Sequence, residues 1–417
     1  MKFQDCQHMK NKEIKTVVPK LRFPEFQETE EWDVKPLAKI AYVVAGQSPE
    51  GSNCNDIGVG IPFYQGKTDF GEIFLNFPTK WTTKVTKTAN EGDILMSVRA
   101  PVGALNISTN EICIGRGLAA IQPYQNKWFL YYFLSSIKNS IIGNGGSVFD
   151  SINKDQIEKI RILIPKNPKE QQKIADCLSS IDDLITSTVK KIESLKAHKK
   201  GLIQQLFPIK GKKIPVIRFP EFQNAGEWKE KLLEQISSGI FDGTHQTPRY
   251  VERGIPFFSV ENVVSGVKNK FISQEDYIIA TSKNKPQKGD ILITRIGRIG
   301  KSVVVNWEYE FSVYVTLAVI KKSVQFDSYY LHSFFQTNLY QTEIQNKSLL
   351  NAVPCKINME ALRKTRVLLP PEMNEQQKIA DCLSSLDELI TALTQKLEAL
   401  KTHKKGLMQQ LFPGMTE

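Results

Sequence analysis

Apolar residues recur at helical spacing along two long segments of the chain, each bounded by proline. In the segment that ends before Pro208 the apolar positions alternate in steps of four and three, and the segment that ends before Pro413 repeats this spacing. A spacing of 3.5 residues is typical of a helix that presents a continuous seam to a partner helix. The predicted seam includes Ile174, Leu178, Ile181, Ile185, Ile192 and Leu195 in the first segment, and Ile379, Leu383, Leu386, Ile390, Leu397 and Leu400 in the second.

The two helical segments have almost the same sequence. "EQQKIADCLSSIDDLI" begins at Glu170, and "EQQKIADCLSSLDELI" begins 205 positions later at Glu375. A single helix cannot bury its apolar seam alone, and the simplest partner is the other copy. We therefore expect an antiparallel, two-fold-like pair of helices. The alternative is that each helix packs only on its own globular region.

Each seam contains a lysine, followed two residues later by a glycine. Lys199 and Lys404 either fix the register of the helix pair, as polar seam residues can, or pack their stems while their ammonium groups reach water. Gly201 and Gly406 lower the stability of a helix. We expect these glycines to mark a bend or a close helix crossing.

Shorter motifs indicate that the whole chain is a tandem duplication. "RFPEFQ" begins at Arg22 and at Arg218, each time followed by Glu-Trp, and "GDIL" begins at Gly92 and at Gly289. The "GDIL", "RILIP" and "RVLLP" segments predict strands, whereas "WFLYYFLSSI" and "SYYLHSFFQT" predict helices. The predicted fold class is α+β, with two α/β regions joined by two long helices that form an antiparallel coiled coil in a pseudo-two-fold tandem repeat. The expected segments are 1–168, 169–208, 209–370 and 371–413.

Composition and charge narrow the classes of function. The net charge of +11 favours an acidic partner, with nucleic acid as the first candidate. No apolar run approaches the ~18 residues of a membrane span, and the N-terminal stretch lacks the apolar core of a signal peptide. The six cysteines include no Cys-x-x-Cys pair, which fits a reducing cytoplasm.

Signatures of catalysis are missing from the sequence. "GIPFYQGKT" at Gly60 has five residues between its glycines, whereas a phosphate-binding loop has four, and the second copy of this segment lacks the Gly-Lys pair. The five histidines are well separated and do not form a zinc cluster. We therefore expect binding surfaces, without catalysis and without a cofactor or metal held by this chain.

In its arrangement of motifs the chain resembles the DNA-specificity subunit of type I restriction-modification systems. The resemblance rests on the two "EQQKIAD" helices, each preceded by "RILIP" or "RVLLP", on the two "GDIL" strands, and on "FDGTHQTPRY" with "GIPFFSVENV" at 241–263. It implies two target-recognition domains, each of which reads one half of a bipartite site in double-stranded DNA, while the helices act as a spacer.

The resemblance also implies partners. The helices of such a subunit dock two modification subunits, which carry S-adenosylmethionine and methylate adenine, and a restriction subunit that uses ATP and Mg²⁺ can join them. The specificity subunit itself is non-catalytic and cytoplasmic, and it takes no cofactor.

Side chains suited to DNA contact gather in a few loops of the two variable regions. Arginine can contact guanine through two hydrogen bonds, and a glycine-rich loop lets the backbone approach a phosphate. For each arginine the alternatives are a solvated surface charge or a phosphate contact. The candidates are Lys67, Arg99, Arg116 and Ser147 in the first region, and Thr244, His245, Arg249, Arg295, Arg298 and Lys301 in the second.

Two other functions compete with this interpretation. The first is a basic coiled-coil scaffold with two lobes that do not bind DNA, which would show no dependence of DNA affinity on salt. The second is the recognition subunit of a related restriction system, in which methylation and cleavage are fused in one partner.

Overall fold

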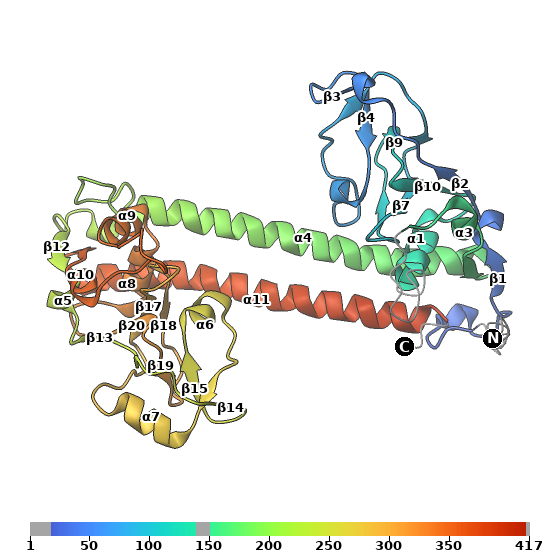
Figure 1. Cartoon of the computed structure of the whole chain (residues 1–417). Helices are drawn as coiled ribbons and strands as arrows, with labels where there is room; N and C mark the ends of the chain where they lie inside the picture. Colours follow the sequence, from blue (N-terminus) through green and yellow to red (C-terminus); the bar gives the residue numbers. More distant parts are fainter. Residues whose placement is uncertain (1–17, 139–150, 414–417) are drawn as a thin grey trace, which may run out of the picture. The chain divides into compact units, whose positions relative to one another are not determined.

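The computed structural model describes residues 18–138 and 151–413, and Figure 1 labels their helices and strands. The chain divides into two compact units, which we call unit 1 (1–188 with 396–417) and unit 2 (189–395). These units do not coincide with the four segments expected from the sequence, because the boundary between them falls inside both long helices. Each unit thus contains one globular region together with half of each helix.

Unit 1 is built around a four-stranded antiparallel sheet of order β2-β10-β7-β8, and a five-stranded sheet of order β3-β5-β4-β9-β6 lies beside it. A short ladder of β1 with β11 closes the region. In Figure 1, β3 and β4 lie farther from the long helix α4 than β7 and β10 do. The strands are β1 (Asp33–Pro36), β2 (Ala41–Ala45), β3 (Cys54–Asn55), β4 (Ile61–Tyr64), β5 (Trp81–Thr82), β6 (Thr88–Ala89), β7 (Ile94–Ser97), β8 (Leu105–Ile107), β9 (Ile112–Ile114), β10 (Leu118–Pro123) and β11 (Arg161–Ile164), and the helices are α1 (Lys127–Ser136), α3 (Lys154–Glu158) and the first half of α4 (Pro168–Leu206).

Unit 2 repeats this plan with a four-stranded sheet of order β13-β20-β17-β18, a second sheet of order β14-β16-β15-β19, and a closing ladder of β12 with β21. Its strands are β12 (Lys229–Leu232), β13 (Ile240–Asp242), β14 (Tyr250–Val251), β15 (Ile255–Phe258), β16 (Phe271–Ile272), β17 (Ile291–Thr294), β18 (Ser302–Val304), β19 (Ser312–Val313), β20 (Leu317–Ile320) and β21 (Arg366–Leu369), and its helices are α5 (Leu233–Ile236), α6 (Val260–Ser265), α7 (Gln274–Thr281), α8 (Ser328–Phe335), α9 (Asn338–Asn346), α10 (Met359–Arg363) and the first half of α11 (Met373–Leu411).

The predicted elements are confirmed. The "GDIL" segments form β7 and β17, the proline-ended segments form β11 and β21, and the aromatic segments form α1 and α8. Both long helices run for 39 residues without interruption. The expectation that Gly201 and Gly406 mark a close helix crossing is wrong, because a Cβ added at either position would meet nothing within 4 Å.

Within unit 1 the two helix segments pack antiparallel. Leu178 near the start of α4 shares a core cluster with Leu411 at the end of α11. Farther along α4, both carboxylate oxygens of Asp182 accept hydrogen bonds from Lys404 Nζ, at 2.6 and 2.8 Å. The partner residue number thus falls as the α4 number rises, which is the mark of antiparallel packing.

Unit 2 contains the same contact with the roles of the helices exchanged. Here Lys199 of α4 donates to both oxygens of Asp387 of α11, at 2.6 and 2.7 Å. Lys199 and Asp387 are the repeat equivalents of Lys404 and Asp182. This reciprocal exchange is what a two-fold-related contact produces. It also indicates that the seam lysines fix register through an ion pair.

The recurrence of "RFPEFQ", Glu-Trp and "EQQKIAD" has one structural cause. In unit 1, Glu170 at the start of α4 is 1% exposed and accepts hydrogen bonds from Arg22 Nε at 2.7 Å and from Trp32 Nε1 at 3.1 Å. In unit 2, Arg218 and Trp228 donate to Glu375 in the same way, at 2.7 and 3.3 Å. A buried carboxylate needs such partners, so three motifs distant in sequence are required together.

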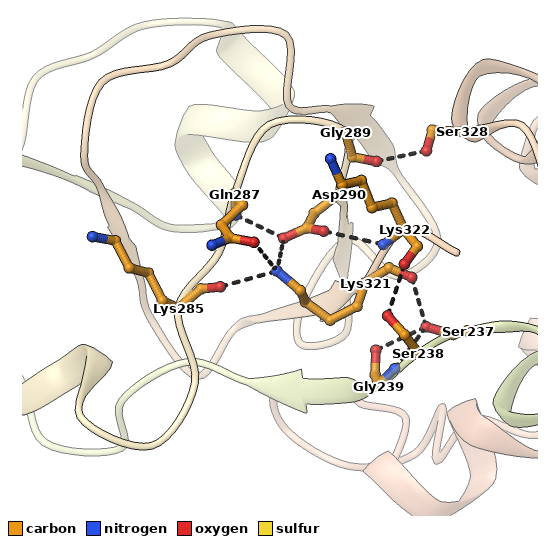
Figure 2. Close-up of polar contacts among 10 residues, drawn as sticks. All are labelled: Ser237, Ser238, Gly239, Lys285, Gln287, Gly289, Asp290, Lys321, Lys322 and Ser328. Carbon is orange, nitrogen blue, oxygen red and sulfur yellow. Dashed lines mark hydrogen bonds and ion pairs between the residues drawn. The ribbon is translucent and has the colours of Figure 1, made fainter. Parts of the chain in front are cut away.

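The recurring "GDIL" motif has a structural role of the same kind. Figure 2 shows Asp290, which is fully buried and whose carboxylate accepts from the backbone N–H of Gln287 at 2.7 Å and from Lys321 Nζ at 2.6 Å. In unit 1 the equivalent Asp93 accepts from the Asn90 N–H and from Gln122 Nε2. Burial raises the pKa of Asp93. The aspartate therefore joins the turn before each central strand to the neighbouring strand.

Candidate nucleic-acid interface

In each unit the candidate DNA-contacting residues belong to loops at one edge of the four-stranded sheet. In unit 2, β13 and β17 both run antiparallel to β20, so their C-terminal ends lie at the edge where β20 begins. The loop after β13, the turn between β17 and β18, and the residues before β20 therefore meet there. We call these three segments the unit 2 edge.

Arg295 does not present its guanidinium to the surface of the unit 2 edge. Its Nη1 donates to Asp242 Oδ2 at 3.1 Å and to the Val315 carbonyl at 3.0 Å, while its Nε donates to the Ile357 carbonyl at 3.3 Å. The side chain is 8% exposed. Burial lowers the pKa of Arg295, and the charge of Asp242 opposes that shift. This geometry argues against the interpretation of Arg295 as a base-reading residue, because the side chain is buried and its Nε and Nη1 donate within the protein.

The other candidates at the unit 2 edge differ in how far their side chains are exposed. His245 is 74% exposed in its side chain and pairs through Nε2 with Asp242 Oδ2 at 3.0 Å. Thr244 is half-buried, and its backbone N–H donates to the Val313 carbonyl at 3.1 Å. Arg249 and Arg298 are exposed. The structure thus brings Thr244, His245, Arg295 and Arg298 to one edge of the sheet.

Lys301 faces a different feature of unit 2. It is exposed and lines a pocket of about 1100 Å³ next to the C-terminal half of α4. The same pocket is lined by Lys196, Lys199, Lys200 and His332. The pocket could not be predicted from the sequence, because Lys301 and His332 approach the α4 lysines only through the tertiary fold.

The same edge of the unit 1 sheet carries Arg99 and Arg116. Arg99 lies in the turn between β7 and β8, and Arg116 lies just before β10, so both belong to the edge where β10 begins. Both side chains are exposed. Lys67 follows β4, and the Cβ of a residue replacing Gly117 would lie 2.3 Å from the Gln65 carbonyl oxygen, which brings the β4 end close to this edge. We call these segments the unit 1 edge. Ser147 lies outside the described residues.

The two edges share an equivalent pair of backbone hydrogen bonds. In unit 2 the Arg295 N–H donates to the Thr316 carbonyl, and the Ile357 N–H donates to the Arg295 carbonyl, both at 2.9 Å. In unit 1 Val98 makes the equivalent pair of bonds, with the Gly117 carbonyl and the Ile152 N–H, both at 2.9 Å. The two edges therefore share a backbone frame and differ in the side chains mounted on it.

The seam residues are most deeply buried near the globular region of each unit. On α4, Ile174, Leu178, Ile181, Ile185 and Ile192 are buried and Leu195 is half-buried. On α11, Ile379 and Leu383 are buried, whereas Leu386, Ile390, Leu397 and Leu400 are half-buried. The middle of α11 thus keeps partly exposed apolar side chains, among which Leu389 outside the seam is 42% exposed.

Sequence reasoning missed the acidic residues that organise these sites. Asp242 holds Arg295 and His245, while Asp182 holds Lys404 and also accepts from Tyr132 Oη at 2.7 Å. Burial, with the hydrogen bond to Asp182, raises the pKa of Tyr132. A signal was present for Asp182, since Asp387 repeats it 205 positions later. No such signal indicated that Asp242 pairs with Arg295, because the two residues lie 53 positions apart.

Metal and membrane features are not found in the part of the chain that the structure covers. Among residues 18–138 and 151–413, histidine, cysteine and acidic side chains form no group of three that could hold a metal ion. In these same ranges, the helices lack a stretch long and apolar enough for a membrane span.

Comparison with known proteins gives consistent matches along the chain. Residues 29–197 and 203–402 each match the family described as "Type I restriction modification DNA specificity domain". The MjaIX specificity subunit of a type I restriction enzyme from Methanocaldococcus jannaschii is 25% identical over 94% of this chain and 96% of its own length. A chain of the same organism assigned as the MjaX specificity subunit is 44% identical over 42% of this chain, and the match spans 43% of that protein.

A solved structure has the same fold. The crystal structure of a type I restriction-modification S subunit from M. genitalium superposes with a TM-score of 0.66 at 17% identity, over 96% of this chain and all of that one.

Proposed function

Because the chain belongs to the family of type I restriction-modification DNA specificity proteins, with two matching domains that cover most of its length, we propose that it recognises a bipartite site in double-stranded DNA. In this proposal the unit 1 edge reads one half of the site and the unit 2 edge reads the other half. The observation that carries the proposal is the pair of sheet edges, which share a backbone frame and carry different exposed side chains.

Exposure of the charged groups supports a division of roles at each edge. Arg99, Arg116 and Arg298 are exposed, so their guanidinium groups can donate to base edges or to phosphates. Arg295 instead positions the β17–β18 turn through Asp242. The net charge of +11 adds a long-range attraction to DNA that carries no sequence information.

The helices support a second part of the proposal, the assembly with partner subunits. The reciprocal Lys199–Asp387 and Lys404–Asp182 pairs give the two units equivalent helix surfaces. Equivalent surfaces suit two copies of one partner. We assign that partner as the modification subunit, which would supply S-adenosylmethionine and the adenine methyl transfer, and a restriction subunit would supply ATP- and Mg²⁺-dependent steps. The specificity chain then acts in the cytoplasm as a non-catalytic subunit.

Salt-dependent binding tests the proposal against a coiled-coil scaffold. The complex of this chain with its modification subunits should bind duplex DNA with an affinity that falls steeply as salt rises, because bound phosphates release counterions. Arg298→Ala should relax base preference in one half-site, at about 1–3 kcal/mol if the side chain reads a base. Affinity that does not change with salt would contradict DNA binding and favour a scaffold.

A further inference from the structure

The loop between α9 and α10 exposes three large apolar side chains next to the unit 2 edge. In residues 348–356, which we call the apolar loop, Leu349 is 49% exposed, Leu350 is 58% exposed and Val353 is 99% exposed. None of them belongs to a core cluster of the unit. Such side chains on a folded surface are unremarkable singly but suggest a binding site when grouped.

The apolar loop is fixed to the β17–β18 turn by backbone hydrogen bonds. The Leu349 N–H donates to the Lys356 carbonyl at 2.7 Å, which closes the loop, and the Gly297 N–H donates to the Cys355 carbonyl at 2.8 Å. Cys355 Sγ donates to the Gly297 carbonyl at 2.8 Å. Isolated bridges join Lys356 to both Ile296 and Leu349. The base of the loop is therefore joined to the turn that carries Arg298, which places the loop at the unit 2 edge.

The charged residues within the apolar loop and the adjoining turn are all basic. Residues 294–301 and 347–356 contain five basic residues and no acidic residue. Arg298 and Lys356 are exposed, while Lys347 is half-buried and lies 3.7 Å from Glu343. An apolar tip flanked by the exposed basic side chains of Arg298 and Lys356 suits a partner that offers apolar surface between negative charges.

Duplex DNA has that combination. Phosphates flank the grooves, and the bases offer thymine methyl groups and stacked faces that accept leucine or valine side chains. We propose that Leu349, Leu350 and Val353 contact base surfaces of the second half-site, while Arg298 and Lys356 contact its backbone or base edges. This inference rests on the proposed function and adds an apolar contribution to base recognition that the charged candidates do not supply.

The test replaces the apolar loop surface without changing its charge. The double substitution Leu350→Ser with Val353→Ser is made in the full chain, and Val324→Ser is the matched control because Val324 is 94% exposed and lies in the turn before α8. Each chain is assembled with its modification subunits. The affinity for a duplex that carries the methylated target, and for a duplex of unrelated sequence, is measured at several salt concentrations.

The loop variant should bind the target duplex about tenfold or more weakly, which corresponds to ~1.4 kcal/mol. Its affinity for unrelated DNA and its salt dependence should equal those of the parent, since apolar contacts release no counterions. The control should behave like the parent. Unchanged target affinity would overturn the inference, as would failed assembly with modification subunits, which would identify the loop as a protein-docking site. If the parent complex itself bound no DNA, the proposed function would fail instead.

Discussion

The two repeats differ least where they contact the long helices and most where their sheets end. The Arg-Glu-Trp cluster recurs with nearly the same distances at Glu170 and Glu375. At the sheet edges, Val98 and Arg295 occupy the same backbone position with the same hydrogen bonds, yet one is a half-buried aliphatic residue and the other an arginine paired with an aspartate. The chain therefore repeats the contacts that assemble it and varies the surface that faces a target.

The same contrast explains which helix residues are repeated. Lys199 and Lys404 each pair with an aspartate of the other helix, so a change at one position would break a contact that the repeat preserves. The surroundings are nevertheless unequal, because Tyr132 adds a hydrogen bond to Asp182 whereas the region around Asp387 includes His332. Nearly identical helix sequences thus have different neighbours, and the energetic consequence of this difference can be measured.

The largest effect is expected from the shared cluster. Glu170→Ala leaves the buried Arg22 guanidinium without its counter-charge, and Glu375→Ala does the same to Arg218, so each should cost about 3–5 kcal/mol of unfolding free energy. Urea unfolding with hydrogen exchange of each unit measures the loss. Glu25→Ala, which removes an exposed pair with Lys173, is the control and should have no resolvable effect. A loss below ~1 kcal/mol for either buried carboxylate would contradict the shared role.

Acidification should lower the stability of unit 2 through a buried histidine that has no counterpart of similar pKa in α1 of unit 1. Burial lowers the pKa of His332 to about 4, with Lys199 lowering it further and Asp387 opposing the shift. Between pH 4 and 6.5 the unfolded chain binds this proton and the folded unit does not, so the stability of unit 2 should fall on acidification from pH 6.5 to 4, by up to ~3 kcal/mol. Tyr131 on α1 of unit 1, whose pKa burial raises to about 12, stays neutral over this pH range.

His332→Gln is the control for this pH dependence. It removes the titrating group and should flatten the stability of unit 2 over the same pH range, as followed by hydrogen exchange in α8. A parent protein whose unit 2 stability does not change between pH 6.5 and 4 would refute the burial argument.

The seam lysines should not be equivalent in energy. Lys404→Met leaves Asp182, whose side chain is 9% exposed, without a counter-charge. We expect the unfolding free energy to fall by about 2 kcal/mol. Lys199→Met leaves Asp387, which is 47% exposed and can be hydrated, so the loss should be under ~1 kcal/mol. Thermal or urea unfolding of the two variants, side by side, makes the comparison. Equal losses would mean that burial of the aspartate does not decide the cost.

The smallest expected effect is a gain in stability. Gly201→Ala and Gly406→Ala should each add about 1 kcal/mol to the unfolding free energy, because the helix accepts a methyl group and nothing lies within 4 Å of it. Gly243→Ala is the contrasting control, since its Cβ would lie 2.0 Å from the Val313 carbonyl oxygen. It should destabilise unit 2. A loss of stability for Gly201→Ala would indicate a contact that the structure does not contain.

The sequence predicted what depends on local spacing. The heptad seam, the bounding prolines and the repeat were sufficient for the helices, their antiparallel pairing and the two-region plan. Arg295 shows where this reasoning stops: its residue type and its neighbours in "TRIGRIGK" suggested DNA contact, but its burial depends on Asp242, 53 positions away. The Arg-Glu-Trp clusters likewise join residues up to 157 positions apart. The repeated motifs could be recognised in the sequence, but the contacts between them could not be predicted.

We expect the two units to act as interchangeable readers on one repeated scaffold. The chain enters and leaves each globular region through a two-stranded ladder, in which Asp33 pairs with Ile164 in unit 1 and Lys229 pairs with Leu369 in unit 2. These ends correspond residue for residue in the repeat. A second copy of residues 229–369 can therefore replace residues 33–164 while the Arg-Glu-Trp clusters and both long helices are kept.

The direct measurement is the adenine methylome of cells that carry this chimaera with its modification subunits. Because the helix contacts are reciprocal, two copies of one reader should produce a symmetric target made of the second half-site and its inverted copy. The original first half-site should disappear, and the spacer should be retained. Methylation that keeps the first half-site, or that acquires a sequence unrelated to either half, would contradict the account of two independent readers on a shared frame.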